Sequence, residues 1–270
     1  MSGPWEGGGY PAAGDAWAHA ADHVTALALR EAHSPARTPA ASALDVATGS
    51  GPAALALARA GVPRVVGIDT HPGLLGVAAE RARAAGLAER TSFLAADALS
   101  LPFAAGAFDL VVSTFGAMFA PQPRRTAAEL VRVCRPGGVL AVASWTPDGV
   151  MGRIAPTVLS PLGAAPGEPL PTRWGEAAYV AELFAPLPVE VRTRLLHVRV
   201  AYASLGHAVR VFEEKPGPLR AYRRALQAAG RWDEARGALA ELFRRHDRST
   251  DGRLVLDAPY LLALGRVAGP

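Results

Sequence analysis

The stretch LDVATGSGPAAL, residues 44–55, constrains the fold of this chain more than any other segment. Its apolar beginning predicts a buried strand, and its alanine-rich end predicts a helix. Between them, Gly49 and Gly51 begin a Gly-x-Gly-x-x-Ala loop that ends at Ala54. Glycines let a backbone approach a ligand closely, and the N–H groups of the following helix face the ligand's polar atoms. The stretch therefore predicts a ligand-binding loop at the carboxyl end of a sheet strand.

Strands and helices are expected to alternate along the first half of the chain. Apolar runs predict strands at residues 42–48, 64–69, 91–97, 108–115 and 137–145. Helical periodicity predicts helices at residues 16–33, 52–61, 71–86 and 124–134, the first of them capped by Asp15. Short apolar strands separated by amphipathic helices form parallel sheets that are covered on both faces. The pattern therefore predicts an α/β domain.

The second half of the chain is less regular. Residues 189–202 and 260–268 predict two more strands, and residues 204–251 have helical periodicity. Residues 146–174 are rich in proline and glycine, which predicts an irregular connection that could border a substrate pocket.

The composition argues against several kinds of site. Cys134 is the sole cysteine, which excludes an internal disulfide, a multi-cysteine zinc site and an iron–sulfur cluster. His19 and His23 have the spacing of a helical ligand pair, but no third ligand is evident, so we expect no metal. The formal charge of +4 comes almost wholly from arginine, since Lys215 is the sole lysine, and between Arg210 and Arg253 the arginines alternate with carboxylates. Such alternation is typical of solvated helix faces, and we expect no nucleic-acid partner.

The sequence also bears on the protein's location. No apolar run approaches the ~18 residues needed to cross a bilayer. The first residues have neither the basic start nor the apolar stretch of a secretory signal. We therefore expect a cytoplasmic protein without a membrane span, present as a monomer or homodimer.

The glycine loop by itself fits two ligands, a nicotinamide dinucleotide and S-adenosylmethionine. Asp69, at the end of the second predicted strand, could bond the ribose hydroxyls of either one. Asp45 lies inside the end of the first strand, where a carboxylate suits a ligand that bears an ammonium and a sulfonium. Asp97 follows the third strand and could accept a hydrogen bond from an adenine amino group. The Tyr-x-x-x-Lys pair of short-chain dehydrogenases is impossible, because Val211 stands at that spacing before the sole lysine, Lys215.

Together these motifs resemble the class I S-adenosylmethionine-dependent methyltransferases over residues 44–145. The resemblance rests on LDVATGSG, Asp69, ADALSLPF, FDLVVSTFGAMF and RVCRPGG, which occur in the right order and spacing. It is nearest to the small-molecule branch that includes quinone C-methyltransferases and natural-product enzymes. Ala47 departs from the pattern, since many members have glycine there, and we expect an ordinary negative φ at this residue.

The resemblance implies a Rossmann-like, doubly wound, seven-stranded and mostly parallel sheet, with an antiparallel last strand and helical lid insertions. We expect a single domain over residues 1–270. Its expected parts are an N-terminal helix or lid at 1–35, a cofactor-binding core at 40–148, substrate lids at 149–186 and 204–252, and final strands at 187–203 and 254–268.

The resemblance also implies a site for S-adenosyl-L-methionine at the strand ends. The residues expected there are Asp45, Ala47, Gly49 and Gly51 around the methionine moiety, Asp69 at the ribose, Thr70, His71, Asp97 and Ala98 around the adenine, and Ser113, Thr114 and Phe115 next to the transferable methyl group. We expect Asp69→Ala to remove most cofactor affinity with little loss of stability, because an exposed strand-end carboxylate contributes little to packing.

A sulfonium methyl group is strongly electrophilic, so the protein mainly has to align a nucleophile for in-line SN2 transfer, which can supply ~7 to 11 kcal/mol of the barrier. An oxygen or nitrogen acceptor must also lose a proton, and a histidine would serve as the base. The candidate bases are His19, His23, His197 and His207. The candidate substrate walls are Trp17, Met118, Phe119 and Trp174.

We expect a small, partly apolar or aromatic acceptor that is methylated on oxygen or carbon, in secondary metabolism or quinone biosynthesis. The sequence STFG follows the fourth strand, where enzymes that methylate amino groups of nucleic acids carry an Asp/Asn-Pro-Pro-aromatic tetrapeptide. Two alternatives stay open: a dinucleotide-dependent oxidoreductase, and a methyltransferase fold with a repurposed non-methylating or binding role.

Overall fold

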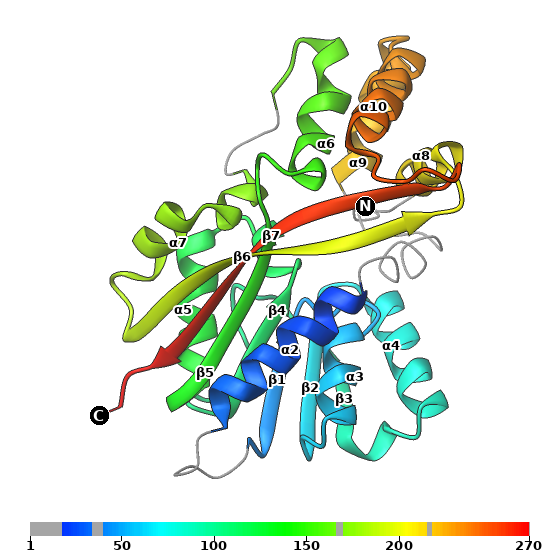
Figure 1. Ribbon diagram of the computed structural model, residues 1–270. Helices are drawn as coiled ribbons and strands as arrows, with labels where there is room; N and C mark the ends of the chain where they lie inside the picture. Colours follow the sequence, from blue (N-terminus) through cyan, green and yellow to red (C-terminus); the bar gives the residue numbers. More distant parts are fainter. Residues whose placement is uncertain (1–17, 34–39, 166–169, 215–217, 270) are drawn as a thin grey trace.

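Seven strands form one sheet, in the order β3-β2-β1-β4-β5-β7-β6 (Figure 1). The computed structural model describes residues 18–33, 40–165, 170–214 and 218–269. The strands are β1 (Ser42–Val46), β2 (Arg64–Asp69), β3 (Thr91–Ala95), β4 (Phe108–Thr114), β5 (Cys134–Trp145), β6 (Val189–Tyr202) and β7 (Leu254–Val267). Only β7 runs antiparallel to its neighbours. The expected doubly wound, mostly parallel sheet with an antiparallel last strand is confirmed.

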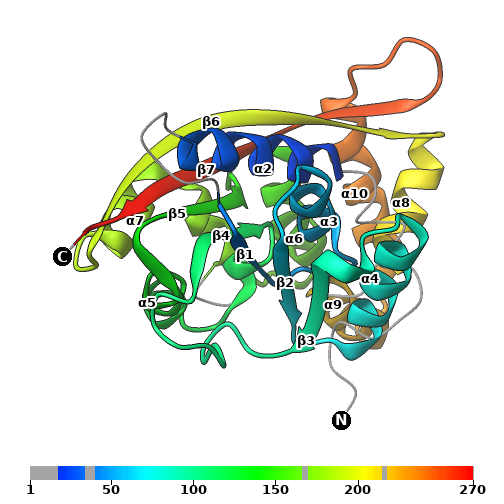
Figure 2. The same cartoon turned by 90° about the horizontal axis from the view of Figure 1, so that it is seen from below.

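Helices cover both faces of this sheet. The helices that the structure describes are α2 (Ala18–Ala32), α3 (Pro52–Arg59), α4 (Pro72–Ala84), α5 (Pro123–Val133), α6 (Val150–Leu159), α7 (Ala177–Phe184), α8 (Leu205–Glu214), α9 (Pro218–Ala228) and α10 (Trp232–His246). Helix α2 packs against α3, β4 and β5, whereas α5 packs against α7, β4 and β5. Seen from below, α2 and α5 lie on opposite sides of the sheet (Figure 2). The carboxyl tips of the parallel strands lie between these two helix layers, at the edge where ligands of open α/β sheets bind.

The first strand and helix form as the glycine-loop pattern predicts. All five residues of β1 are buried, because the strand is covered on both faces. Helix α3 begins with Pro52, whose missing N–H costs nothing in the first turn. Gly61, just after the helix, has a φ of 96°, which a residue with a Cβ rarely adopts.

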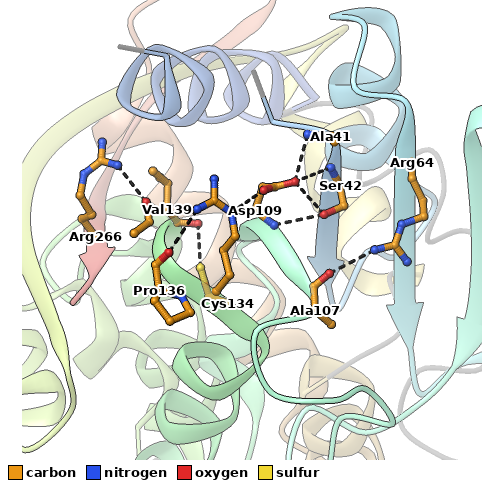
Figure 3. Close-up of polar contacts among 11 residues, drawn as sticks. Ala41, Ser42, Arg64, Ala107, Asp109, Cys134, Pro136, Val139 and Arg266 are labelled. Atoms are coloured by element: carbon orange, nitrogen blue, oxygen red, sulfur yellow. Dashed lines mark hydrogen bonds and ion pairs between the residues drawn. The ribbon is translucent and has the colours of Figure 1, made fainter. Parts of the chain in front are cut away.

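One carboxylate joins three strands at the amino edge of the sheet (Figure 3). Oδ2 of Asp109 in β4 accepts hydrogen bonds from the backbone N–H groups of Ala41, at 3.0 Å, and Ser42, at 2.8 Å. It also accepts the Ser42 hydroxyl at 2.9 Å, while Oδ1 accepts Nε of Arg135 in β5. Burial by itself would raise the pKa of Asp109, but the bonds from Arg135 and Ser42 outweigh it and hold the pKa below its usual value. The cluster fixes β1, β4 and β5 relative to one another.

The last two strands form a ribbon that extends past the rest of the sheet (Figure 1). β6 pairs with β7 along the whole of both strands, whereas β5 pairs with β7 only at residues 260–266. This ribbon packs against three helices, α6 and α10 through β7 and α8 through β6. Helix α10 also packs against α6 and α8, and all three pack against α9. These helices form a separate layer above the carboxyl edge.

The structure departs from the sequence expectations in several places. Residues 146–174 were expected to be irregular, but they contain α6 and the short 3₁₀ helices η3 (Ser160–Leu162) and η4 (Pro171–Gly175). Glycines there serve close packing, since a Cβ at Gly152 would lie 2.2 Å from the Thr146 carbonyl oxygen. The last strand begins at Leu254, in agreement with the expected final strand at 254–268, although the apolar run begins only at residue 260; its first part pairs only with β6. Asp15 and Trp17 lie outside the described residues.

Candidate functional site

A cavity of about 210 Å³ opens at the carboxyl tips of the first four strands. Its lining comes from the loops after β1, β2, β3 and β4, which the sheet order brings side by side. The lining residues are Ala47, Ile68, Asp69, Thr70, Leu74, Ala96, Asp97, Ala98, Phe115, Gly116, Ala117, Phe119, Ala120 and Pro121. The cavity thus unites cofactor residues predicted on four separate loops, with Phe119 from the predicted substrate wall.

The glycine loop below this cavity has an unusual backbone. The φ angles of Ala47 and Gly49 are both 56°, and that of Gly51 is 87°. The negative φ expected at Ala47 is therefore wrong. Its left-handed conformation results from the close approach of the β4 loop, where a Cβ on Gly116 would lie 2.5 Å from the Ala47 Cβ and 2.7 Å from the Ala47 carbonyl oxygen. Only glycine fits at position 116 in this arrangement.

Asp69 ties the glycine loop to the tip of β2. Its Oδ2 accepts the N–H of Gly49 at 2.9 Å, and its Oδ1 accepts the N–H of His71 at 2.9 Å. Burial raises the pKa of Asp69 above its usual value, although both hydrogen bonds oppose that shift. A carboxylate offers about four acceptor positions, so each oxygen can still accept a ligand hydroxyl. Asp69 is only partly exposed and is anchored by backbone groups, so the expectation of an exposed side chain at this position is wrong.

Asp45 lies beneath the loop rather than along the cavity wall. It is 1% exposed, and its Oδ2 accepts the Thr48 hydroxyl at 2.6 Å and the N–H of Ala54 at 3.0 Å. These bonds brace the loop and the first turn of α3. Burial raises the pKa of Asp45 to about 7, against the two hydrogen bonds. The attraction of Asp45 for a ligand ammonium stays a prediction. Because Asp45 lies beneath the loop, this attraction would act across the loop backbone.

The two loops expected around the adenine differ in their exposure. Asp97 is exposed, and its Oδ1 accepts the N–H of Leu99 at 2.9 Å. Thr70 is also exposed and lines the cavity with Ala98. His71 instead caps α4, because its Nδ1 accepts the N–H of Leu74 at 3.3 Å. The exposed edges of Asp97 and Thr70 are available to a heterocycle at this end of the cavity.

The tip of β4 forms the opposite wall. The buried Ser113 hydroxyl donates to the Val46 carbonyl at 2.8 Å and accepts the N–H of Ala117 at 2.9 Å, which joins the tips of β1 and β4. Oγ1 of Thr114 is buried without a hydrogen-bond partner. Phe115 has a φ of 57° and stacks on Trp145 at 3.6 Å between ring centroids. A bulky residue held in the left-handed region marks a position that the surrounding structure enforces.

The four candidate bases lie apart from one another. His19 is exposed on α2, and Nδ1 of His207 in α8 accepts the N–H of Ala203 at 3.3 Å. His197 in β6 lies 3.1 Å from Asp257. His23, further along α2, lies 3.3 Å from the Tyr260 hydroxyl. Each therefore needs its own test as a base.

Two of the predicted substrate walls are buried. Met118 is 2% exposed, and Trp174 is 2% exposed with its ring edge against Phe184, so neither lines the cavity. Phe119 is 37% exposed and does line it. Sequence reasoning missed Gly116, Trp145 and Tyr260. Gly116 could have been noticed as a glycine just after a strand, whereas the other two are brought to the site by the pairing of β5 with β7.

Two further findings concern metal ligands and helix length. Within the described ranges, no group of three or more His, Cys, Asp or Glu side chains could hold a metal ion. Among the helices that the structure describes, none combines the length and apolar character needed to cross a membrane.

Comparison with known proteins gives a consistent picture. Residues 44–142 match a family described as the methyltransferase domain. An uncharacterized protein of Mycobacterium bovis is 45% identical over 152 residues, which cover 56% of this chain and 54% of that protein. The demethylmenaquinone methyltransferase of Thermus thermophilus is 47% identical over 105 residues, which cover 38% of this chain and 47% of that protein. The chain spans about half the length of the curated relatives it matches.

The fold is also found among solved structures. The cyclase SpnF is similar with a TM-score of 0.56 and 23% identity, over 93% of this chain and 83% of that chain. At this identity the likeness shows the fold alone.

Proposed function

We propose that the chain transfers a methyl group from S-adenosyl-L-methionine to a small, partly apolar acceptor. The match of residues 44–142 to a methyltransferase domain family supports this proposal. The observation that carries the proposal is Asp69, held between two backbone N–H groups on the wall of a cavity that it shares with Asp97 and Phe115. The ribose and the adenine of this cofactor need carboxylate acceptors. Its methionine chain needs a loop whose backbone can be approached closely.

The residues fit this cofactor in chemical terms. Asp69 would accept the ribose hydroxyls with acceptor positions that its backbone bonds leave open. Asp97 would accept the adenine amino group, with the N–H of Ala98 beside it. The backbone of Ala47, Gly49 and Gly51 would surround the methionine chain, and Thr70 and His71 would border the adenine.

Other predicted residues have supporting parts. Asp45 would favour the ligand's positive groups from beneath the loop, which it also braces through Thr48. Ser113 would hold the tips of β1 and β4 together, while Thr114 and Phe115 would border the reacting end of the site.

When bound, S-adenosylmethionine supplies an electrophilic methyl group that is open to in-line attack. The chain has to position the acceptor, exclude water and take up a proton if the accepting atom carries one. Phe115 and the aromatic rings packed on it give the site an apolar wall. We infer that the segments at 149–186 and 204–252, which include α6, α8 and α10, enclose the acceptor. The demethylmenaquinone methyltransferase relative supports an aromatic acceptor, in quinone or secondary metabolism.

The test is isothermal titration with S-adenosylhomocysteine and with a nicotinamide dinucleotide. We expect the first ligand to bind and the second to give no heat. Binding of the dinucleotide alone would contradict the proposal and support the alternative of a dinucleotide-dependent oxidoreductase. The cyclase SpnF has the same fold, so transfer of a labelled methyl group to an acceptor is the result that separates our proposal from a repurposed role.

A further inference from the structure

Three aromatic rings connect the cavity to the outer strands of the sheet. Phe115 lines the cavity and lies parallel to Trp145, with an interplanar angle of 5°. Tyr260 in β7 pairs with Trp145 in β5 and directs its ring edge at Phe115, with 5.4 Å between centroids and an angle of 87°. Tyr260 is fully buried. We call Phe115, Trp145 and Tyr260 the aromatic cluster.

One of the four candidate bases is bonded to this cluster. Nδ1 of His23 lies 3.3 Å from the Tyr260 hydroxyl, across 237 residues of sequence. His23 is exposed on α2, which packs against the two strands whose tips carry Phe115 and Trp145. His197 instead faces Asp257, and His207 faces the N–H of Ala203. The contact therefore links a solvent-accessible imidazole to the buried wall of the site.

We propose that His23 is the base for an aromatic hydroxyl acceptor, and that Tyr260 is the residue that positions it. This inference rests on the proposed methyltransferase function and names the acceptor class of the same site. The aromatic cluster suits a flat aromatic acceptor, because aromatic rings gain from stacked and edge-on contacts beyond their area burial. His23 and Tyr260 form a hydrogen-bonded polar pair at this cluster. One imidazole beside an apolar wall suits an acceptor with one hydroxyl to deprotonate.

The hydrogen bond decides which nitrogen reacts. When Nδ1–H of His23 donates to the Tyr260 oxygen, Nε2 carries no proton and can accept one, since the partner of one ring nitrogen sets the state of the other. Burial raises the pKa of Tyr260, so its hydroxyl stays neutral and acts as a fixed partner. The acceptor O–H bond breaks and its proton passes to Nε2 of His23. The oxygen's electron pair forms the bond to the methyl carbon, and the electron pair of the broken carbon–sulfur bond remains on sulfur as a thioether.

The experiment measures the ionisation of a bound phenol instead of turnover. Protein saturated with S-adenosylhomocysteine is titrated with 4-nitrophenol, well below the pKa of this probe, and the phenolate is followed by its visible absorbance. We expect the wild-type protein to bind the probe largely as phenolate. His23→Gln should lower the bound phenolate fraction at least about tenfold, on the scale of a lost general base. Tyr260→Phe keeps the aromatic packing and should produce a smaller loss in the same direction.

His33→Gln is the matched control, because it removes an exposed histidine just after the same helix, whose Nδ1 lies 2.6 Å from the Leu29 carbonyl oxygen. We expect it to leave the phenolate signal unchanged. Failure of 4-nitrophenol to bind the saturated wild-type protein, or an equal phenolate fraction in His23→Gln, would overturn the inference. Titration of S-adenosylhomocysteine into every variant comes first. A wild-type protein that fails this step speaks against the proposed function, whereas a variant that passes it and loses only the phenolate signal supports the role of His23.

Discussion

Ala47 carries the main backbone strain in the glycine loop, with a φ of 56°. The left-handed conformation costs a residue with a Cβ roughly 1 to 2 kcal/mol. Ala47→Gly should therefore raise the free energy of unfolding by about 0.5 to 1 kcal/mol, after the larger entropy loss of glycine is subtracted. Urea denaturation measures the change. Ala79→Gly in the middle of α4 is the control and should lower the free energy of unfolding by about 1 kcal/mol.

Asp69 anchors two backbone N–H groups and is proposed to bind the ribose. A single substitution should affect both stability and cofactor binding. Asp69→Ala removes a carboxylate that holds two backbone N–H groups, and it should lower the free energy of unfolding by about 1 to 3 kcal/mol. It should also weaken S-adenosylhomocysteine binding by roughly 10- to 100-fold, as expected for the loss of hydrogen bonds to a charged group. Thermal unfolding and isothermal titration measure the two effects.

The comparison for Asp69 is Asp97→Ala, which removes an exposed carboxylate on the next strand. This variant should bind the cofactor product more weakly while unfolding like the wild type. Normal affinity in Asp69→Ala would show that the ribose assignment is wrong.

At the scale of elements, Asp109 fixes the positions of β1, β4 and β5 at the amino edge. Asp109→Ala should lower the free energy of unfolding by about 2 to 3 kcal/mol, because several hydrogen bonds to one charged group are lost. Since the pKa of Asp109 is lowered in the folded protein, its contribution is present above pH 4 and is lost as the pH falls through the folded value. Urea denaturation at neutral pH and in acid measures both.

Its control is Glu182→Ala, which breaks the exposed pair with Arg124 and should cost at most about 1 kcal/mol. Because Asp109 lies at the edge opposite the cavity, S-adenosylhomocysteine affinity should be unchanged in both variants. A large loss of affinity in Asp109→Ala would contradict that separation.

The elements that could be predicted from the sequence are those specified by local patterns. β1, α3 and β2 occur where alternating apolar runs, Pro52 and Gly61 predict them, because each pattern acts within a few residues. α6 was missed, since the glycines and prolines around it serve packing against the preceding turn. The start of β7 at Leu254 agrees with the expected bounds, whereas its pairing with β6 along the whole of both strands joins segments far apart in sequence.

At the scale of the whole molecule, the same distinction holds for the site. Asp69, Asp97 and Phe115 could be predicted because each lies at or just after the end of a strand and parallel strands end at one edge. The contact between His23 and Tyr260 could not, since it joins the two ends of the described chain. The left-handed Ala47 was also beyond local reasoning, because the neighbouring β4 loop imposes it.

The buried Asp45 should make the stability of the whole ligand-free protein depend on pH. Its pKa rises from 3.8 to about 7 on folding, so the folded state binds a proton that the unfolded state has released. The associated stability is complete below pH 4 and is lost as the pH rises through 7, with a slope of at most about 1.4 kcal/mol per pH unit.

Asp45→Asn keeps an oxygen to accept the Thr48 hydroxyl and the N–H of Ala54 but cannot ionise. The free energy of unfolding of both proteins is measured in urea from pH 5 to pH 8. The value for Asp45→Asn minus the value for the wild type should therefore increase as the pH rises. The charge of Asp69 helps to raise the pKa of Asp45, so the same comparison in an Asp69→Asn background isolates the contribution of Asp45. A constant difference over this range would mean that Asp45 is already ionised in the folded protein, and that the loop holds a buried negative charge before any cationic ligand arrives.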